Sequence, residues 1–198
     1  LEQSTQAQLT LRIKTGMPTP MVDLKIVDAD GHAVAHDGQA LGEIVVRAPW
    51  LTQGYLHEPE KGAELWQDGW LHTGDLASID PAGRVEIKDR IKDVIKTGGE
   101  WISSLDLENL ISEHASVISV AVVGIADEQW GERPMALVVC IPGHAVDQSI
   151  LEAHLQQFVA SGRINKWAIP KQFDFVAEIP KTSVGKINKK LIRENQRN

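Results

Sequence analysis

Three short segments of this 198-residue chain combine glycine with charged residues in a way that could serve nucleotide chemistry. The first segment spans residues 69–76 and places Asp75 directly after Gly74 and before an apolar residue. A carboxylate held there could accept two hydrogen bonds from a vicinal diol such as a ribose. An Asx turn that precedes a strand would need the same residues, and the segment alone favours that structural interpretation.

The second segment, residues 88–101, carries four cations and two aspartates in its first nine residues and then a glycine pair. Arg90 could form a bidentate contact with a phosphate or with ribose hydroxyls. Gly98 and Gly99 allow a positive φ or a close approach of the backbone to a ligand. A solvated charge run before a hairpin explains the same residues equally well. The segment lies where a β-rich half of the chain meets an α/β half, a position suited to a hinge.

The third segment, residues 179–190, places Lys186 directly after Gly185 and before an expected helix. A lysine held in this way can project a point charge toward a phosphate or a carboxylate. The segment is not a Walker-type loop, because Ile187 stands where a serine or threonine would bind magnesium. An ordinary surface lysine is the structural alternative.

Alternating apolar residues predict that strands position the first two segments. These strands are expected at residues 22–26, 43–47 and 83–89. Residues 1–20 are expected to form an entry linker, because they end in two prolines that disfavour helix. Residues 21–89 are therefore predicted to be mainly β.

A small domain of helices and strands is expected to position the third segment. Ser103, with Asp106 three residues later, resembles a capping box and predicts a helix from about residue 104. The other elements predicted after residue 92 are strands at 117–125, 134–141 and 172–176 and helices at 150–158 and 187–195. The predicted fold class of the whole chain is α+β.

Charge and hydropathy exclude several classes of partner. Twenty Lys and Arg against 27 Asp and Glu give a net charge of -7, which repels nucleic acids and anionic membranes. The longest apolar stretch, residues 117–126, is far shorter than the ~20 residues that span a bilayer. We therefore expect neither nucleic-acid binding nor a transmembrane segment.

The cysteine and histidine content predicts a protein of the reducing cytoplasm without a metal site. Cys140 stands alone in an apolar run, which favours a small core residue over a nucleophile and rules out an intrachain disulfide. His32 and His36 lie in a turn with no residue spaced to complete a zinc site. Because the sequence starts with neither a methionine nor a signal peptide, we expect the tail of a longer chain.

The order and spacing of the three segments resemble those of the adenylate-forming acyl-CoA synthetases, a family that includes luciferases and the adenylation domains of peptide synthetases. Residues 69–76 resemble the Thr-Gly-Asp motif of the family. Residues 86–101 resemble its hinge and the loop that follows, and residues 180–186 resemble its C-terminal lysine motif. The resemblance covers nearly all of the chain.

The resemblance implies three regions. Residues 1–20 would be the linker from an N-terminal part that carries the phosphate loop and the acyl pocket of the family. Residues 21–89 would be the β-barrel-like subdomain that closes the large adenylation domain. Residues 90–198 would be the small α+β C-terminal domain, a mobile lid.

The resemblance also implies a role for each candidate residue. Asp75 would hold the ribose hydroxyls of ATP and AMP, and Arg90 would contact the ribose and phosphate region. Lys92 would be the hinge position about which the lid rotates. Lys186 would bridge the substrate carboxylate and the α-phosphate during adenylation, and it is the catalytic residue that the resemblance implies.

A further group of residues would bind CoA. Gly98, Gly99 and Glu100 would lie in the loop that lines the pantetheine tunnel. Trp101 follows where some relatives carry an arginine that contacts CoA, and Trp130 stands where those relatives have a second such arginine. The chain departs from the family pattern at these two tryptophans.

The implied function is that of the C-terminal part of a fatty-acid-type acyl-CoA ligase. Such an enzyme activates a carboxylic acid with ATP and transfers the acyl group to CoA, and its Mg²⁺ would be held mainly by the upstream part. The 198 residues alone are expected to be inactive. An adenylation domain that loads a carrier-protein phosphopantetheine, and a non-catalytic nucleotide-binding module, remain alternatives. The carboxylic acid and the oligomeric state, a homodimer included, stay open.

Overall fold

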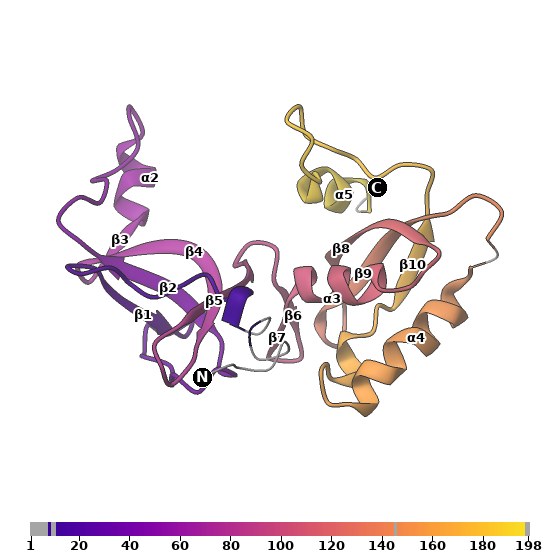
Figure 1. Cartoon of the computed structure of the whole chain (residues 1–198). Coiled ribbons are helices and arrows are strands. Elements are labelled where there is room, and N and C mark those ends of the chain that lie inside the picture. The colour runs from indigo at the N-terminus through magenta and orange to yellow at the C-terminus, as the bar shows by residue number, and fades with distance from the viewer. Residues whose placement is uncertain (1–7, 9–10, 145, 197–198) are drawn as a thin grey trace. The chain divides into compact units, whose positions relative to one another are not determined.

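The chain divides into two compact units, Leu1–Lys92 and Asp93–Asn198 (Figure 1). The computed structural model describes residue 8, residues 11–144 and residues 146–196. Each unit has its own sheet, and the observed mixture of mainly antiparallel sheets and helices confirms the α+β class expected from the sequence.

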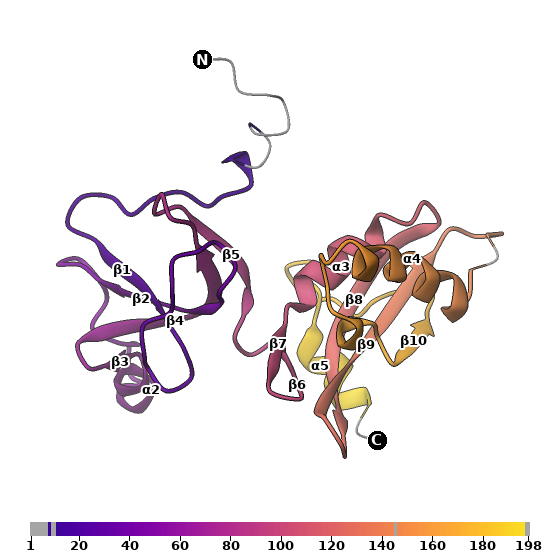
Figure 2. The same cartoon turned by 90° about the horizontal axis from the view of Figure 1, so that it is seen from below.

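The first unit is built on a single antiparallel sheet with the order β1-β2-β4-β3, in which β5 also pairs with β4. Its strands are β1 (Asp23–Val27), β2 (Gly42–Arg47), β3 (Trp66–Gln67), β4 (Trp70–Ile79) and β5 (Val85–Arg90). The short helix α2 (Pro59–Glu64) leads into β3. β3 and β5 pair with successive parts of β4, which also pairs with β2. The long strand β4 is therefore the central strand of this sheet (Figure 2).

The core of the first unit follows from strand alternation. One face of the sheet buries an apolar cluster made of Ile26, Ile44, Ala77, Ile79 and Val85. The three strands that alternation predicts are present within two residues of their expected bounds. Of the linker expected over residues 1–20, residues 1–7, 9 and 10 lie outside the described residues. Thr15 and Gly16 instead exchange backbone hydrogen bonds with Val85.

The second unit contains a sheet with the order β10-β9-β6-β7, in which β8 also pairs with β9. Its strands are β6 (Ile95–Thr97), β7 (Glu100–Ile102), β8 (Val117–Asp127), β9 (Gly131–Cys140) and β10 (Gln172–Phe175). Its helices are α3 (Ser104–Ser112), α4 (Gln148–Ala160) and α5 (Lys189–Asn195), with a 3₁₀ turn, η1, at Lys166–Ala168. β10 runs parallel to β9, and the other pairings are antiparallel.

Helices cover the two faces of this sheet (Figures 1 and 2). On one face, Val120 and Val122 of β8 lie in a buried cluster with side chains of α3 and α4. On the other face, Ala121 and Val123 lie in a second cluster that includes Ile192 of α5. The apolar run that sequence analysis finds at residues 117–126 therefore reflects a strand that is buried on both sides. Among the described residues, no helix is both long and apolar enough to cross a bilayer.

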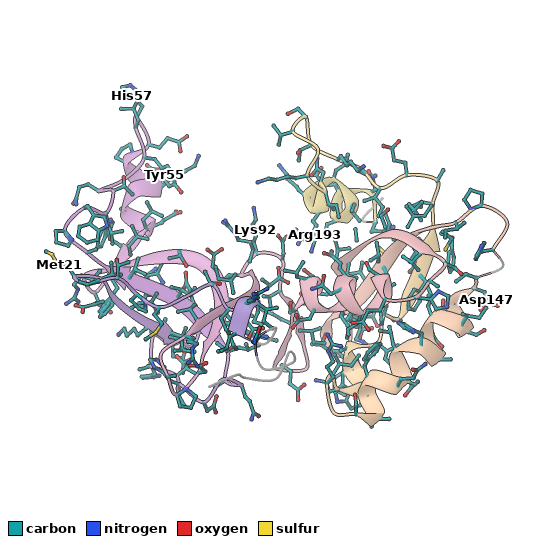
Figure 3. All side chains as sticks on the ribbon, viewed as in Figure 1. Met21, Tyr55, His57, Lys92, Asp147 and Arg193 are labelled. Atoms are coloured by element: carbon teal, nitrogen blue, oxygen red, sulfur yellow. The ribbon has the colours of Figure 1, made fainter. Side chains whose placement is uncertain are left out.

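Side-chain caps begin the helices of the second unit. The Ser103 hydroxyl accepts a hydrogen bond from the Asp106 amide, as the sequence predicts for the start of α3. Asp147, labelled in Figure 3, caps α4 in the same way by accepting from the Ile150 amide. Hydrogen bonds from the Ser149 hydroxyl and the Ile150 amide lower the pKa of the Asp147 carboxyl. The closing helix expected from residue 187 begins only at Lys189, after an Asn188 cap.

The structure agrees with the interpretation of Cys140 as a core residue. This cysteine ends β9 and packs against the cluster beneath α3 and α4. Burial raises the pKa of its thiol, which keeps the reactive thiolate scarce near neutral pH.

Candidate functional site

Residues Thr73, Gly74 and Asp75 lie inside strand β4 and do not form the separate Asx turn that their types favour. β4 pairs with β3 before this point and with β5 from Asp75 onward. Its register with β2 also shifts here. Gly74 has a φ of +70°, a conformation that is strained for residues with a Cβ. The motif is thus an irregularity at which the strand changes partners.

A glutamate that sequence analysis does not single out supports this irregularity. Glu43 Oε1 accepts a hydrogen bond of 2.9 Å from the Gly74 amide, and Glu43 Oε2 pairs with His72 Nδ1 at 2.8 Å. The Thr73 hydroxyl donates to the Ile44 carbonyl at 2.9 Å. Both carboxylate oxygens of Glu43 are therefore used to hold the backbone and side chains on either side of Thr73.

Asp75 and Arg90 are brought together by the pairing of β4 with β5. They stand opposite each other in the ladder, and Arg90 Nε lies 2.7 Å from Asp75 Oδ1. The Arg90 side chain is 60% exposed and that of Asp75 is 22% exposed, so solvent and solutes reach both groups. Together they present a carboxylate acceptor and guanidinium donors, the groups that suit a vicinal diol beside a phosphate.

An open cavity of about 600 Å³ lies beside the same stretch of β4 within the first unit. Its β-sheet side is formed by Glu43, His72, Thr73 and Gly74. Its other side is formed by residues in and around α2, namely Tyr55, Glu58, Lys61, Glu64, Leu65 and Gln67. Figure 3 shows Tyr55 at the loop that leads into α2. The Thr73–Gly74 backbone therefore borders an accessible space.

The Gly98–Gly99 pair forms the tip of the hairpin between β6 and β7, and both residues have a positive φ, +57° and +86°. The Gly98 amide donates to the Trp130 carbonyl at 2.9 Å. A Cβ at Gly98 would lie 3.0 Å from Trp130 Cε3, whereas a Cβ at Gly99 would meet nothing within 4 Å. One glycine is needed for a close contact with the protein, and the other faces open space.

The side chains around this hairpin come from three parts of the second unit. Trp130 packs on Trp167 of η1 with ring centroids 5.1 Å apart. Glu100 accepts a hydrogen bond from the Asn165 side chain, and Lys96 lies 5.8 Å from the ring centre of Trp101. Trp101 and Trp130 thus lie at or next to the hairpin.

Lys186 is exposed on a short loop that closes on itself. Lys181 and Ile187 form an isolated bridge at the base of the loop. The Thr182 amide donates to the Lys186 carbonyl at 2.7 Å, and the Lys186 amide donates to the Thr182 hydroxyl at 3.2 Å. The loop therefore holds the Lys186 backbone while its side chain reaches solvent, a geometry that suits both a surface lysine and a residue that engages a ligand.

Three potential metal-binding side chains, Asp28, Asp30 and His32, come together in the described part of the chain, and all three are exposed. Asp28 Oδ1 accepts hydrogen bonds from the backbone amides of Asp30 and His32. The amide of His32 contributes most to lowering the pKa of the Asp28 carboxyl. These contacts form a polar turn, and the group lies in the β1–β2 connection, away from the candidate residues in sequence.

Comparison with known proteins identifies the second unit. Residues 106–186 match the family model described as the AMP-binding enzyme C-terminal domain. Residues 106–186 therefore form an AMP-binding enzyme C-terminal domain. The match ends at Lys186, the lysine of the third segment.

The similarity to known proteins extends beyond residues 106–186. It is 44% identical over 196 residues to the long-chain-fatty-acid-CoA ligase of Thermus thermophilus, covering 98% of this chain and 35% of that protein. It is 42% identical over 189 residues to the 3-methylmercaptopropionyl-CoA ligase of Ruegeria lacuscaerulensis, covering 96% of this chain and 34% of that protein. The chain thus spans about a third of the length of the curated relatives that it matches.

Two solved synthetases have a similar fold. The amide bond synthetase McbA of Marinactinospora thermotolerans superposes with a TM-score of 0.80 at 32% identity, over 96% of this chain and 37% of McbA. The o-succinylbenzoate CoA synthetase MenE of Bacillus subtilis, solved with its acyl-adenylate intermediate, gives a TM-score of 0.80 at 26% identity, over 99% of this chain and 38% of MenE.

The support given by Glu43 to the Gly74 amide can be tested on this chain directly. We expect Glu43→Ala to speed hydrogen exchange at Gly74 by roughly 10- to 100-fold, because a hydrogen bond to a charged acceptor is worth ~1.5–3 kcal/mol. The measurement is amide exchange followed by NMR. Glu58→Ala is the control, since the Glu58 carboxylate pairs with the exposed Lys61 and lines the same cavity. Unchanged exchange at Gly74 in Glu43→Ala would show that the carboxylate does not hold the irregularity.

Proposed function

We propose that this chain forms the C-terminal part of an ATP-dependent, AMP-forming acyl-CoA ligase that activates a fatty or related carboxylic acid. The observation that carries the proposal is the contact of Asp75 with Arg90. It places a carboxylate that can accept hydrogen bonds from a diol beside a guanidinium that can donate hydrogen bonds to a phosphate. The similarity to fatty-acid-CoA ligases over 98% of the chain supports the same activity.

In the first half-reaction, an oxygen of the substrate carboxylate attacks the α-phosphate of ATP. The new P–O bond gives the acyl-adenylate, and the bond to pyrophosphate breaks. Asp75 accepts hydrogen bonds from the ribose hydroxyls, and Arg90 donates to the ribose and phosphate region. Negative charge gathers at the α-phosphate in the transition state, so the Lys186 ammonium stabilises the transition state more than the ground state. The Mg²⁺ that accompanies ATP would be held mainly by residues outside this chain.

In the second half-reaction, the CoA thiol attacks the acyl carbonyl and AMP leaves. We propose that the second unit rotates about Lys92, so that the Gly98–Gly99 hairpin replaces Lys186 at the reaction centre. Lys92 is the last residue of the first unit, which supports a hinge at this position. Few dihedral angles at a unit boundary can carry such a rotation. Gly98, Gly99, Glu100 and Trp101 would then border the pantetheine chain.

The proposal is tested by incubating the complete ligase with ATP, CoA and fatty acids from short to long, with AMP and thioester measured in parallel. We expect AMP and acyl-CoA to appear in equal amounts with at least one acid. AMP or acyl-adenylate without thioester would instead indicate transfer to a carrier-protein phosphopantetheine. Absence of all three products with every acid would contradict the ligase proposal and favour a nucleotide-binding module.

Lys186→Ala is expected to slow adenylation by ~10²–10³-fold, the effect of removing a preorganised charge contact. Thioester formation from supplied acyl-adenylate and CoA should be retained, because the lysine acts only in the first step. Pyrophosphate release and thioester formation measure the two steps separately. Lys181→Ala removes an exposed lysine of the same loop and serves as the control. Equal slowing of both half-reactions by Lys186→Ala would contradict the proposal that the second unit presents Lys186 in the first half-reaction and the Gly98–Gly99 hairpin in the second.

Gly99→Val is expected to impair thioester formation more than adenylation. Apart from its chain neighbours, no protein atom lies within 4 Å of a Cβ at Gly99, so a valine would leave the packing of the unit intact. Its side chain would occupy the space proposed for the pantetheine chain. Its positive φ would still cause strain. Gly143→Val is a matched control, because Gly143 has a φ of +83° and the same open space. The ratio of the two half-reaction rates separates obstruction from strain, and an equal loss in both would contradict a role at the CoA tunnel.

A further inference from the structure

The helix that follows the Lys186 loop depends on tertiary contacts for its position. α5 has seven residues, too few to be stable as an isolated helix in water. Its Ile192 is 1% exposed and belongs to the second apolar cluster. One buried isoleucine allows the helix to slide or rotate, so the polar contacts of α5 must set its register.

Lys189, the first residue of α5, makes the most buried of these polar contacts. Its Nζ lies 2.8 Å from Glu108 Oε1 and donates to the Ser104 hydroxyl at 2.6 Å. The Lys189 and Glu108 side chains are only 14% and 11% exposed. Glu108 Oε1 also accepts a 2.8 Å hydrogen bond from the Val122 amide of β8. Helices α3 and α5 pack on opposite faces of β8. The Glu108 carboxylate of α3 contacts both β8 and the first residue of α5.

A second ion pair holds the same side of α5 one turn later. Arg193, labelled in Figure 3, donates through Nη2 to the carboxylate of Asp93. Asp93 is the first residue of the second unit and directly follows Lys92. Residues four apart lie on one side of a helix, so Lys189 and Arg193 together set both the position and the rotation of α5.

Lys186 is only two residues before Asn188, the cap of α5, and its loop is closed by its own backbone hydrogen bonds. The Asn188 amide also donates to the Pro180 carbonyl, which ties the base of the loop to the start of the helix. Loop and helix therefore move as one piece. A displacement of Lys189 would therefore displace the backbone of Lys186 as well.

Stability alone does not explain a largely buried ion pair at this position. Desolvation of two charges offsets much of their attraction, and apolar side chains of similar volume often stabilise a fold equally well. What an ion pair with additional hydrogen bonds supplies is a defined geometry. Lys189 and Glu108 form such an ion pair, and Glu108 Oε1 also accepts a hydrogen bond from a backbone amide.

We propose that Lys189 and Glu108 are positioning residues that hold Lys186 in the place required for adenylation. This inference rests on the proposed function, since it assigns the pair a task in the first half-reaction. Lys189 acts through Lys186 and does not touch the substrate. The pair is not needed when the Gly98–Gly99 hairpin serves the second half-reaction.

The test uses the complete ligase with Lys189→Met, which keeps the length of the side chain and removes its charge. We expect pyrophosphate release to slow by about 10- to 100-fold, because a misplacement of ~1 Å can cost 10²-fold in rate. Thioester formation from supplied acyl-adenylate should stay within about twofold of the unmodified enzyme. Lys190→Met is the matched control, since the neighbouring Lys190 side chain is 84% exposed and pairs with Glu194 at 3.8 Å.

A double variant separates positioning from general destabilisation. In Lys186→Ala, which lacks the group to be positioned, adding Lys189→Met should cause no further loss of adenylation. A full additional loss in that background would overturn the inference, as would equal slowing of both half-reactions by Lys189→Met. If Lys186→Ala alone leaves adenylation unchanged, the proposed function itself is wrong.

Glu108→Gln keeps the inference testable should Lys189→Met fail to fold. The glutamine retains an oxygen that can accept from the Val122 amide but loses the charge that pairs with Lys189. We expect Glu108→Gln to slow adenylation but not thioester formation. Added to Lys186→Ala, it should cause no further loss of adenylation. Circular dichroism establishes folding before each rate is measured, and loss of both half-reactions in folded Glu108→Gln would contradict a positioning role.

Discussion

Strands β8 and β9 bury both of their faces, and the arrangement of the second unit follows from this constraint. A strand pair with two apolar faces needs a layer on each side. Helices α3 and α4 supply one layer, and α5 with the chain around Ile179 supplies the other. The C-terminal helix is therefore part of the core architecture. Because the Lys186 loop leads directly into this helix, a residue proposed to act in catalysis is placed by the packing of the sheet.

Glycines in the left-handed region mark each of the three candidate segments. Gly74, Gly98 and Gly185 have φ values of +70°, +57° and +80°. A regular strand would send successive side chains to alternate faces, and a positive φ breaks that alternation. Next to each glycine stands a residue that we assign a role: Asp75, Gly99 or Lys186. The chain thus uses departures from regular structure, each supported by hydrogen bonds, to present its candidate groups.

Local signals in the sequence predict much of the fold and part of the site. The alternation in β1 and the Ser103 cap of α3 are visible because they depend on residues close in sequence. The full length of β4 is not predictable in this way, since its Thr73–Gly74 bend is held in a sheet by neighbouring strands whose pairing overrides local propensity. The contacts of Glu43 and Glu108 are not predictable from the sequence for the same reason. Each meets partners far along the chain, and alternation or helical spacing alone gives no sign of which polar side chain will be buried beside a backbone amide.

The bond from the Val122 amide to Glu108 has a consequence for the behaviour of the protein at high concentration. Within the described sheet β8 pairs with β9 on one side, so its other side is a strand edge, and an uncovered edge can recruit a second chain into an intermolecular sheet. A carboxylate already occupies the amide at the middle of that edge, and a lysine accompanies it. A foreign strand would have to displace both charged groups to continue the ladder, so the pair that contacts α5 also opposes strand addition at this edge.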